Sequence, residues 1–133
     1  MAKEELRNRK LNTPLGVFSQ ATKIEANGTL VFVSGLTSRD PDGKVVGVGD
    51  VKKQTETILE NMQTILADAG GTLDDVMKVT VYIRNMKDFD AIHEVRRRYF
   101  KAPLPASTMV EVSMLVSPEL LIEIEAFAVI PSK

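Results

Sequence analysis

The sequence predicts a two-layer α+β domain in which two helices pack on one face of a single mixed β-sheet. Strand-like and helix-like segments follow one another in the order ββαβαββ. Both helical segments carry apolar residues at helical spacing, and the segment Val76–Arg84 alternates between apolar and polar residues as a half-buried strand does. The 133 residues contain no internal repeat or linker and therefore predict one domain over residues 1–133.

The N-terminal third is predicted to hold an arm and a hairpin. Residues 1–14 are polar and end at Asn12-Thr13-Pro14, so we expect about this length to form a mobile N-terminal arm. Two β-rich runs follow, Val17–Glu25 and Thr29–Gly35. The turn pair Asn27-Gly28 joins them and tolerates positive φ, which predicts a hairpin.

A long helix is predicted after an irregular loop over residues 36–49, which is rich in Gly, Pro and Asp. Asp50 can cap this helix, because its carboxylate can accept hydrogen bonds from the free N–H groups of the first turn. The pair Gly70-Gly71 ends the helix. Thr72 with Asp75 resembles a short capping motif in the connection to the next strand.

The second half is predicted to hold a helix and two more strands. The helix covers about residues 88–101, and the strands are Ser107–Leu115 and Leu120–Ile130, separated by the turn Ser117-Pro118. The last strand is apolar on both faces apart from two acids. Because the helices cover only one face of the sheet, its other face needs a second cover, and another copy of the chain would supply it.

Composition excludes several classes of protein. Seventeen Lys and Arg are matched by eighteen acids, which argues against a nucleic acid partner held by clustered positive charge. There is no cysteine and only one histidine, so we expect neither a thiolate metal site nor a histidine-rich one. No apolar run approaches the roughly 20 residues that span a bilayer, and the charged start lacks the apolar centre of a signal peptide. We therefore expect a cytoplasmic protein without a membrane partner.

Arg96 is the least expected residue of the second helix, because it falls on the apolar face, whereas Arg97 and Arg98 are predicted to face solvent. Two interpretations stay open. The guanidinium either pairs with a protein carboxylate or holds a substrate carboxylate at a cleft through two parallel bonds. His93 lies one turn earlier at the edge of the same face, where it either titrates near neutrality or is a satisfied surface group.

Two acids of the last strand are candidates for general acid or base chemistry. Glu123 and Glu125 are two residues apart, so both point to the face that carries Leu121 and Phe127. Next to these apolar side chains, a carboxylate must be ion-paired or hydrogen-bonded, or its pKa must be raised. The alternative is structural ion pairing, for instance with Arg96.

Arg39 is a further candidate, because it lies in a loop directly after the strand end Val33-Ser34-Gly35 and loops often carry binding residues. The alternative is a pair with the nearby Asp40 or Asp42.

Several stretches together resemble the Rid family of RidA/YjgF-type reactive intermediate deaminases, in order and spacing over nearly the whole chain. They are LGVFSQA (15–21), VFVSG (31–35), DAGGTLDDVMKVTVYIRNMKDF (68–89), PAST (105–108) and IEIEAFA (122–128). The resemblance implies a chorismate-mutase-like fold and a homotrimer with clefts between subunits. It also implies hydrolysis of enamine and imine intermediates, such as 2-aminoacrylate, to 2-oxo acids and ammonia without metal or organic cofactor.

The resemblance assigns roles to matching positions. Glu123 matches the acid that positions water, and Ser34 and Gly35 match a strand end that lines the cleft. Ser107 stands where the RidA branch has the arginine that holds the substrate carboxylate. The other residues at cleft positions are Phe18 in place of a Tyr, His93 in place of an Asn, Arg96 in place of a Tyr, and Thr108 and Met109 after the serine.

A missing arginine in the cleft and an unexpected one on the helix together suggest relocation of the positive charge. Our hypothesis is that Arg96, with Arg39 as second choice and His93 assisting, holds the acid group of the substrate. The substrate is then expected to be a longer or dicarboxylate enamine rather than simple 2-aminoacrylate. The alternatives are a non-catalytic trimer that binds small acids or a regulatory partner, and a ribonuclease, which the balanced charge disfavours.

Overall fold

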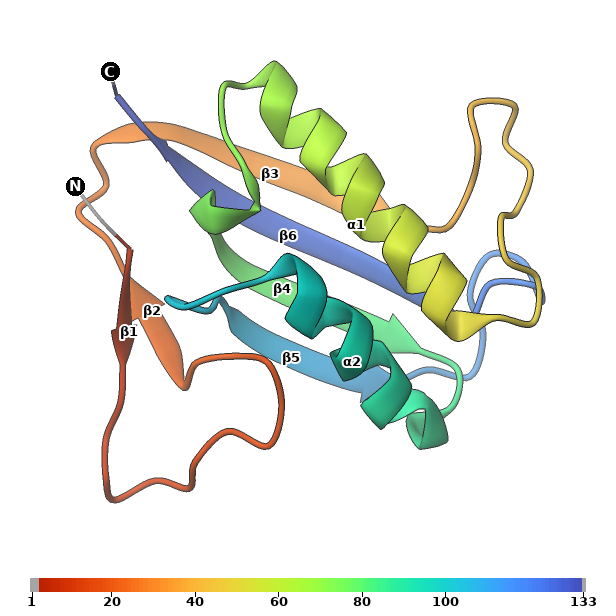
Figure 1. The fold of residues 1–133 in the computed structure, drawn as a ribbon, viewed down its shortest axis with the longest axis horizontal. Helices are drawn as coiled ribbons and strands as arrows, with labels where there is room; N and C mark the ends of the chain where they lie inside the picture. Colours follow the sequence, from red (N-terminus) through yellow and green to blue (C-terminus); the bar gives the residue numbers. More distant parts are fainter. Residues whose placement is uncertain (1–2, 133) are drawn as a thin grey trace.

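The computed structural model describes residues 3–132 and consists of a sheet covered on one face by two helices (Figure 1). The four strands lie in the order β3-β6-β4-β5, where β5 is parallel to β4 and the other neighbours are antiparallel. Their bounds are β3 Gly28–Leu36, β4 Val76–Ile83, β5 Ala106–Glu111 and β6 Ile122–Pro131. The predicted α+β class, with two helices on one mixed sheet, is confirmed.

The predicted hairpin at the N-terminal end is wrong. Only Ala21–Lys23 forms a strand, β2, and it pairs with β1 (Glu4–Leu6) in a separate two-stranded sheet. Strand β3 pairs instead with β6, from Gly28 opposite Pro131 to Leu36 opposite Ile124. The long apolar strand β6 offers β3 more burial than the short segment before the turn, and this tertiary gain overrides the local turn signal.

Part of the predicted N-terminal arm contacts the rest of the domain. Beside the pairing of β1, the Lys3 ammonium donates to the Val76 carbonyl at 2.8 Å. These contacts place residues 3–6 against the rest of the domain.

The helices begin and end close to where the sequence predicts. Helix α1 spans Val51–Asp68 and is capped by Asp50, whose carboxylate accepts from the Lys53 N–H at 3.0 Å. The capping motif of Thr72 and Asp75 forms around the short 3-10 helix η1 (Leu73–Asp75). Helix α2 spans Phe89–Tyr99 and follows a second 3-10 helix, η2 (Met86–Asp88).

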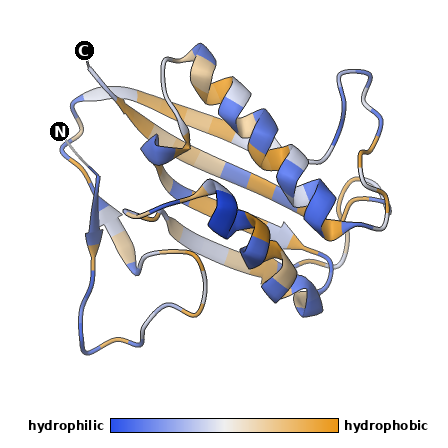
Figure 2. Cartoon of the chain, viewed as in Figure 1, coloured by the Kyte–Doolittle hydropathy of each residue, from blue (hydrophilic) through white to orange (hydrophobic). Residues whose placement is uncertain are grey.

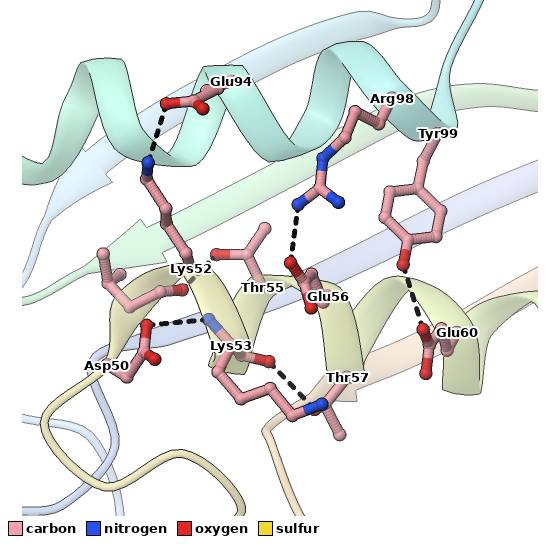
Figure 3. A network of polar contacts seen from close by, with 11 residues as sticks. Asp50, Lys52, Lys53, Thr55, Glu56, Thr57, Glu60, Glu94, Arg98 and Tyr99 are labelled. Atoms are coloured by element: carbon pink, nitrogen blue, oxygen red, sulfur yellow. Dashed lines mark hydrogen bonds and ion pairs between the residues drawn. The ribbon is translucent and has the colours of Figure 1, made fainter.

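Polar contacts join the exposed sides of α1 and α2 (Figure 3). They are Lys52 to Glu94 at 2.8 Å, Arg98 to Glu56 at 2.6 Å and Tyr99 to Glu60 at 3.1 Å. Exposed pairs of this kind contribute about 0 to 1 kcal/mol each, so they fix the orientation of the helices more than they stabilise the fold.

The core lies between the helices and the sheet, where the apolar residues coloured orange in Figure 2 meet. It contains residues of α1, α2, β4 and β6: Ile58, Leu59, Met62, Leu66, Ile92, Val95, Val79, Val81, Ile83, Ile122 and Ile124. Within residues 3–132 no helix covers the other face of the sheet, and Leu30, Phe32 and Phe127 remain exposed on it. No helix within residues 3–132 has the length and apolar character needed to cross a membrane.

Candidate functional site

The candidate residues form two groups on opposite faces of the sheet. Ser107 of β5 is in register with the buried Val79, so it points toward the helices. Glu123 of β6 alternates with the buried Ile122 and Ile124, so it points toward the uncovered face. The site therefore has a helix side and an uncovered side within one chain.

On the helix side, a cavity of about 230 Å³ lies between α2, β5 and the loop that follows the N-terminal segment. Its lining residues are Asn12, Leu15 and Phe18 of the loop, Phe89 and His93 of α2, and Ser107 and Met109 of β5. Four of the predicted site residues thus meet around one space with mostly apolar walls: Phe18, His93, Ser107 and Met109.

Arg96 lies at this side with only 1% of its surface exposed. Its Nη2 donates to the Val17 carbonyl at 3.2 Å and to Ser107 Oγ at 3.1 Å, while its buried Nη1 has no partner among residues 3–132. Burial lowers the pKa of Arg96 to about 10, which leaves the group charged at neutral pH. The interpretation as an ion pair with a protein carboxylate is wrong within the described chain, because both bonded oxygens are neutral.

His93 is 3% exposed, so it is not the surface group that one interpretation proposed. Its Nδ1 lies 3.0 Å from the Phe89 carbonyl, which can only accept, so Nδ1 carries the hydrogen. The imidazole stacks on the Phe89 ring at 4.2 Å between centroids. The buried Nε2 finds no hydrogen-bond partner within residues 3–132. It faces Gly16, where a Cβ atom would lie 2.1 Å away, so only glycine fits there.

Protonation of His93 is predicted to destabilise the fold. Burial lowers the pKa of His93 most, the charges of Arg96 and Arg97 lower it further, and the Phe89 carbonyl and Asp90 oppose them. The unfolded chain takes up this proton near pH 6.5, before the folded protein does. The free energy of unfolding is therefore expected to fall as the pH drops below about 6.5. Above that pH the contribution of His93 to this free energy is expected to be constant.

Thermal midpoints measured at about pH 7.5 and about pH 5.5 check this expectation in the wild type and in His93→Gln. The wild type should lose more stability between the two conditions than the variant. Equal losses would show that His93 does not carry the pH dependence.

On the uncovered side, Glu123 and Gly35 lie side by side. The register of β3 on β6 is irregular between Val33 and Leu36, and this irregularity brings the backbone of Gly35 against the Glu123 carboxylate. A Cβ atom on residue 35 would lie 2.0 Å from Glu123 Oε2. Neighbouring Ser34 is exposed beside them.

The two acids of β6 differ in their contacts. Glu125 accepts a hydrogen bond from the Tyr82 hydroxyl at 2.5 Å. Glu123 takes part in none of the ion pairs found among residues 3–132. The predicted structural ion pairing of these acids with Arg96 is wrong. The Glu123 carboxylate lies in no ion pair within residues 3–132 and is available to contact a ligand.

Arg84 is a cation of the uncovered side that the sequence analysis did not single out. Tyr82 is opposite Glu123, and Arg84 directly follows the end of β4, with its N–H bonded to the Leu121 carbonyl at 3.1 Å. Its Nη1 lies 3.2 Å from the Met114 sulfur, and its buried Nε lacks a partner within residues 3–132. The alternation of β4 was the signal that placed it on this face.

Two other candidates lie away from the cavity. Arg39 donates from Nη1 to the Gly43 carbonyl at 2.7 Å, while Asp40 accepts from backbone N–H groups of its own loop. The expected pair of Arg39 with Asp40 or Asp42 is thus replaced by a carbonyl contact, and Arg39 is not a lining residue of the cavity. Thr108 points away from Ser107 and accepts from the Lys78 ammonium at 2.7 Å.

The family model described as endoribonuclease L-PSP matches residues 9–130. A RutC family protein of Pyrococcus abyssi is 43% identical over 96% of this chain and 98% of its own length. The 3-aminoacrylate deaminase RutC of Acinetobacter baylyi is 38% identical over 96% of this chain and 98% of its own.

The solved structure of YyfB from Yersinia pestis, a protein of unknown function of the Rid family, is similar to this fold. Its TM-score is 0.88 at 29% identity, covering 98% of this chain and all of that one (100%).

Proposed function

Because this chain belongs to the endoribonuclease L-PSP family, as a Rid/YjgF-type protein, we propose that it hydrolyses imine or enamine intermediates to carbonyl compounds and ammonia. The family as a whole supports either a deaminase of this kind or an endoribonuclease-like role. The observation that carries the deaminase proposal is the Glu123 carboxylate, which lies against the Gly35 backbone and outside every ion pair found among residues 3–132.

The proposed active site needs two copies of the chain. Glu123 and the cavity lie on opposite faces of the sheet, so one copy cannot present both to the same substrate. Rid-family proteins are typically oligomeric, and the exposed Leu30, Phe32 and Phe127 give the uncovered face an apolar surface to bury. We take a homotrimer as the assembly in which Glu123 of one copy faces the cavity of the next.

The chemistry follows from the carboxylate. Glu123 accepts a hydrogen bond from a water molecule and directs its oxygen at the carbon of the C=N bond. A C–O bond forms, the nitrogen takes up a proton, and the C–N bond of the resulting carbinolamine breaks. One imine and one water give one carbonyl compound and one ammonia, and an enamine first takes a proton on carbon to become the imine.

The deaminase fits this chain better than an endoribonuclease. Cleavage of RNA by side chains needs an acid–base pair and cations along the phosphates. The sequence has one histidine and a net charge of −1, and that histidine is buried.

The alternative is a non-catalytic trimer that binds small acids or regulates a partner. It is favoured by one observation, the serine at position 107 in place of the arginine expected in the RidA branch.

The test of the proposed activity uses imines that an amino-acid dehydratase generates in situ. Addition of the protein is expected to speed the disappearance of the intermediate, more so for imines with an apolar chain than for 2-aminoacrylate. Wild type and Glu123→Gln are compared at equal concentration. A protein that is stabilised thermally by a 2-oxo acid but accelerates no imine of the panel is the binder, not the enzyme.

A further inference from the structure

We propose that Arg96, acting through Ser107, is the acid-binding group of the cavity, and that the acid it selects is a monocarboxylate with a short apolar chain. The inference rests on the proposed function only in naming that acid as the substrate, since binding of the acid does not require catalysis.

The first step concerns charge. A buried guanidinium is costly unless an anion compensates it, because burial removes the water that stabilises the charge. Arg96 is bonded to a carbonyl and a hydroxyl, and none of the ion pairs found within residues 3–132 includes it. We infer that the missing negative charge comes from outside residues 3–132.

The second step concerns the direction in which the charge is presented. Arg96 Nη2 donates to Ser107 Oγ, so this oxygen already acts as an acceptor and its own hydrogen is free to donate elsewhere. Ser107 lines the cavity, which makes its hydroxyl a donor strengthened by the cation behind it. An oxygen of the ligand that takes this hydrogen is best matched when it is negative.

The third step concerns the body of the ligand. Leu15, Phe18, Phe89 and Met109 form apolar walls around about 230 Å³, which is smaller than the roughly 300 to 1,000 Å³ of ordinary ligand pockets. Such a space suits a carboxylate with a chain of a few carbons. Arg39 does not line it, so the cavity lacks the second cation on which a dicarboxylate substrate was expected to depend.

The proposal and a structural role for Arg96 predict opposite effects of Arg96→Met. Methionine keeps the length and apolar stem of the side chain and fills irregular space, but it brings no charge. If the acid is the counter-charge, the ligand-free variant melts at or above the wild-type temperature, because an uncompensated buried cation is gone. If the bonds to Val17 and Ser107 hold the fold together, the variant melts below the wild type.

The experiment measures thermal midpoints with sodium butyrate, with butyramide as its uncharged counterpart and with sodium chloride at equal ionic strength. Butyrate alone is expected to raise the midpoint of the wild type. The shift should vanish in Arg96→Met and persist in Arg97→Met, which removes an exposed arginine from the next position of α2. Ser107→Ala should bind butyrate about 10-fold more weakly or worse.

Three results overturn the proposal. They are a wild-type midpoint that butyrate does not raise, an equal shift with butyramide, and a butyrate shift that survives in Arg96→Met. If Arg96→Met does not fold, Ser107→Ala tests the proposal instead. An affinity of this variant for butyrate equal to that of the wild type would contradict the role of the serine. Butyrate has no nitrogen to lose, so a failed deamination assay leaves these results standing, and a failed butyrate assay leaves imine hydrolysis to its own test.

Discussion

Glu123→Gln is expected to lower the rate constant of imine hydrolysis by about 10²- to 10⁴-fold, the range in which a positioned acid or base contributes. The amide keeps the size of the side chain but loses the negative charge that orients the attacking water. Little change in the thermal midpoint is expected, because Glu123 takes part in no ion pair within residues 3–132. The rate of imine disappearance under saturating substrate measures the effect.

Glu125→Gln is the matched control, two residues along the same face of β6. It changes the partner of the Tyr82 hydroxyl and leaves Glu123 in place, so its rate is expected to stay near that of the wild type. Equal losses in the two variants would point to the summed charge of the face rather than to one carboxylate. Full activity of Glu123→Gln would remove the proposed water-orienting role.

Local sequence patterns were sufficient to predict much of the fold. The alternation of β4 survives in the structure, with Val79, Val81 and Ile83 buried against the helices. The first helix follows Asp50 because an N-cap acts on the next three residues, and the sequence contains all of that information. These features are set by neighbours in the chain, which is why periodicity and capping predict them.

Strand partners were not predictable in the same way. The pair Asn27-Gly28 is a good turn signal, yet β3 pairs with β6, about a hundred positions later in the register from Gly28 to Pro131. Strand β5 likewise ends at Glu111, before the predicted limit at residue 115. Both outcomes depend on which strand edges meet in the folded sheet, and a single sequence does not record that.

In the candidate site too, local sequence predicted some features and only the fold determines the others. The helical pattern placed Arg96 on an apolar face, and the structure buries it there. Its contacts could not be predicted, because the Val17 carbonyl is 79 residues away in a segment that the sequence predicted to be a strand of a hairpin. The cavity has no local signature either, since it depends on segments that only the fold brings together.

Gly35→Ala is expected to be the second most damaging change to catalysis, although residue 35 contributes no reacting group. The added Cβ atom would lie 2.0 Å from Glu123 Oε2, so the carboxylate has to move by about 1 Å or more. A displacement of that size at a reacting group costs about 100-fold in rate. Gly35 is not among the glycines with positive φ, so alanine fits the backbone and the midpoint should change little.

A double variant separates this positional effect from any other. If Gly35 acts only through the carboxylate, adding Gly35→Ala to Glu123→Gln lowers the rate no further, because the group it displaces has already lost its function. Losses that multiply in the double variant would mean that Gly35 is needed for the approach of the substrate itself, and the contact with Glu123 would then not explain the activity lost in the single variant.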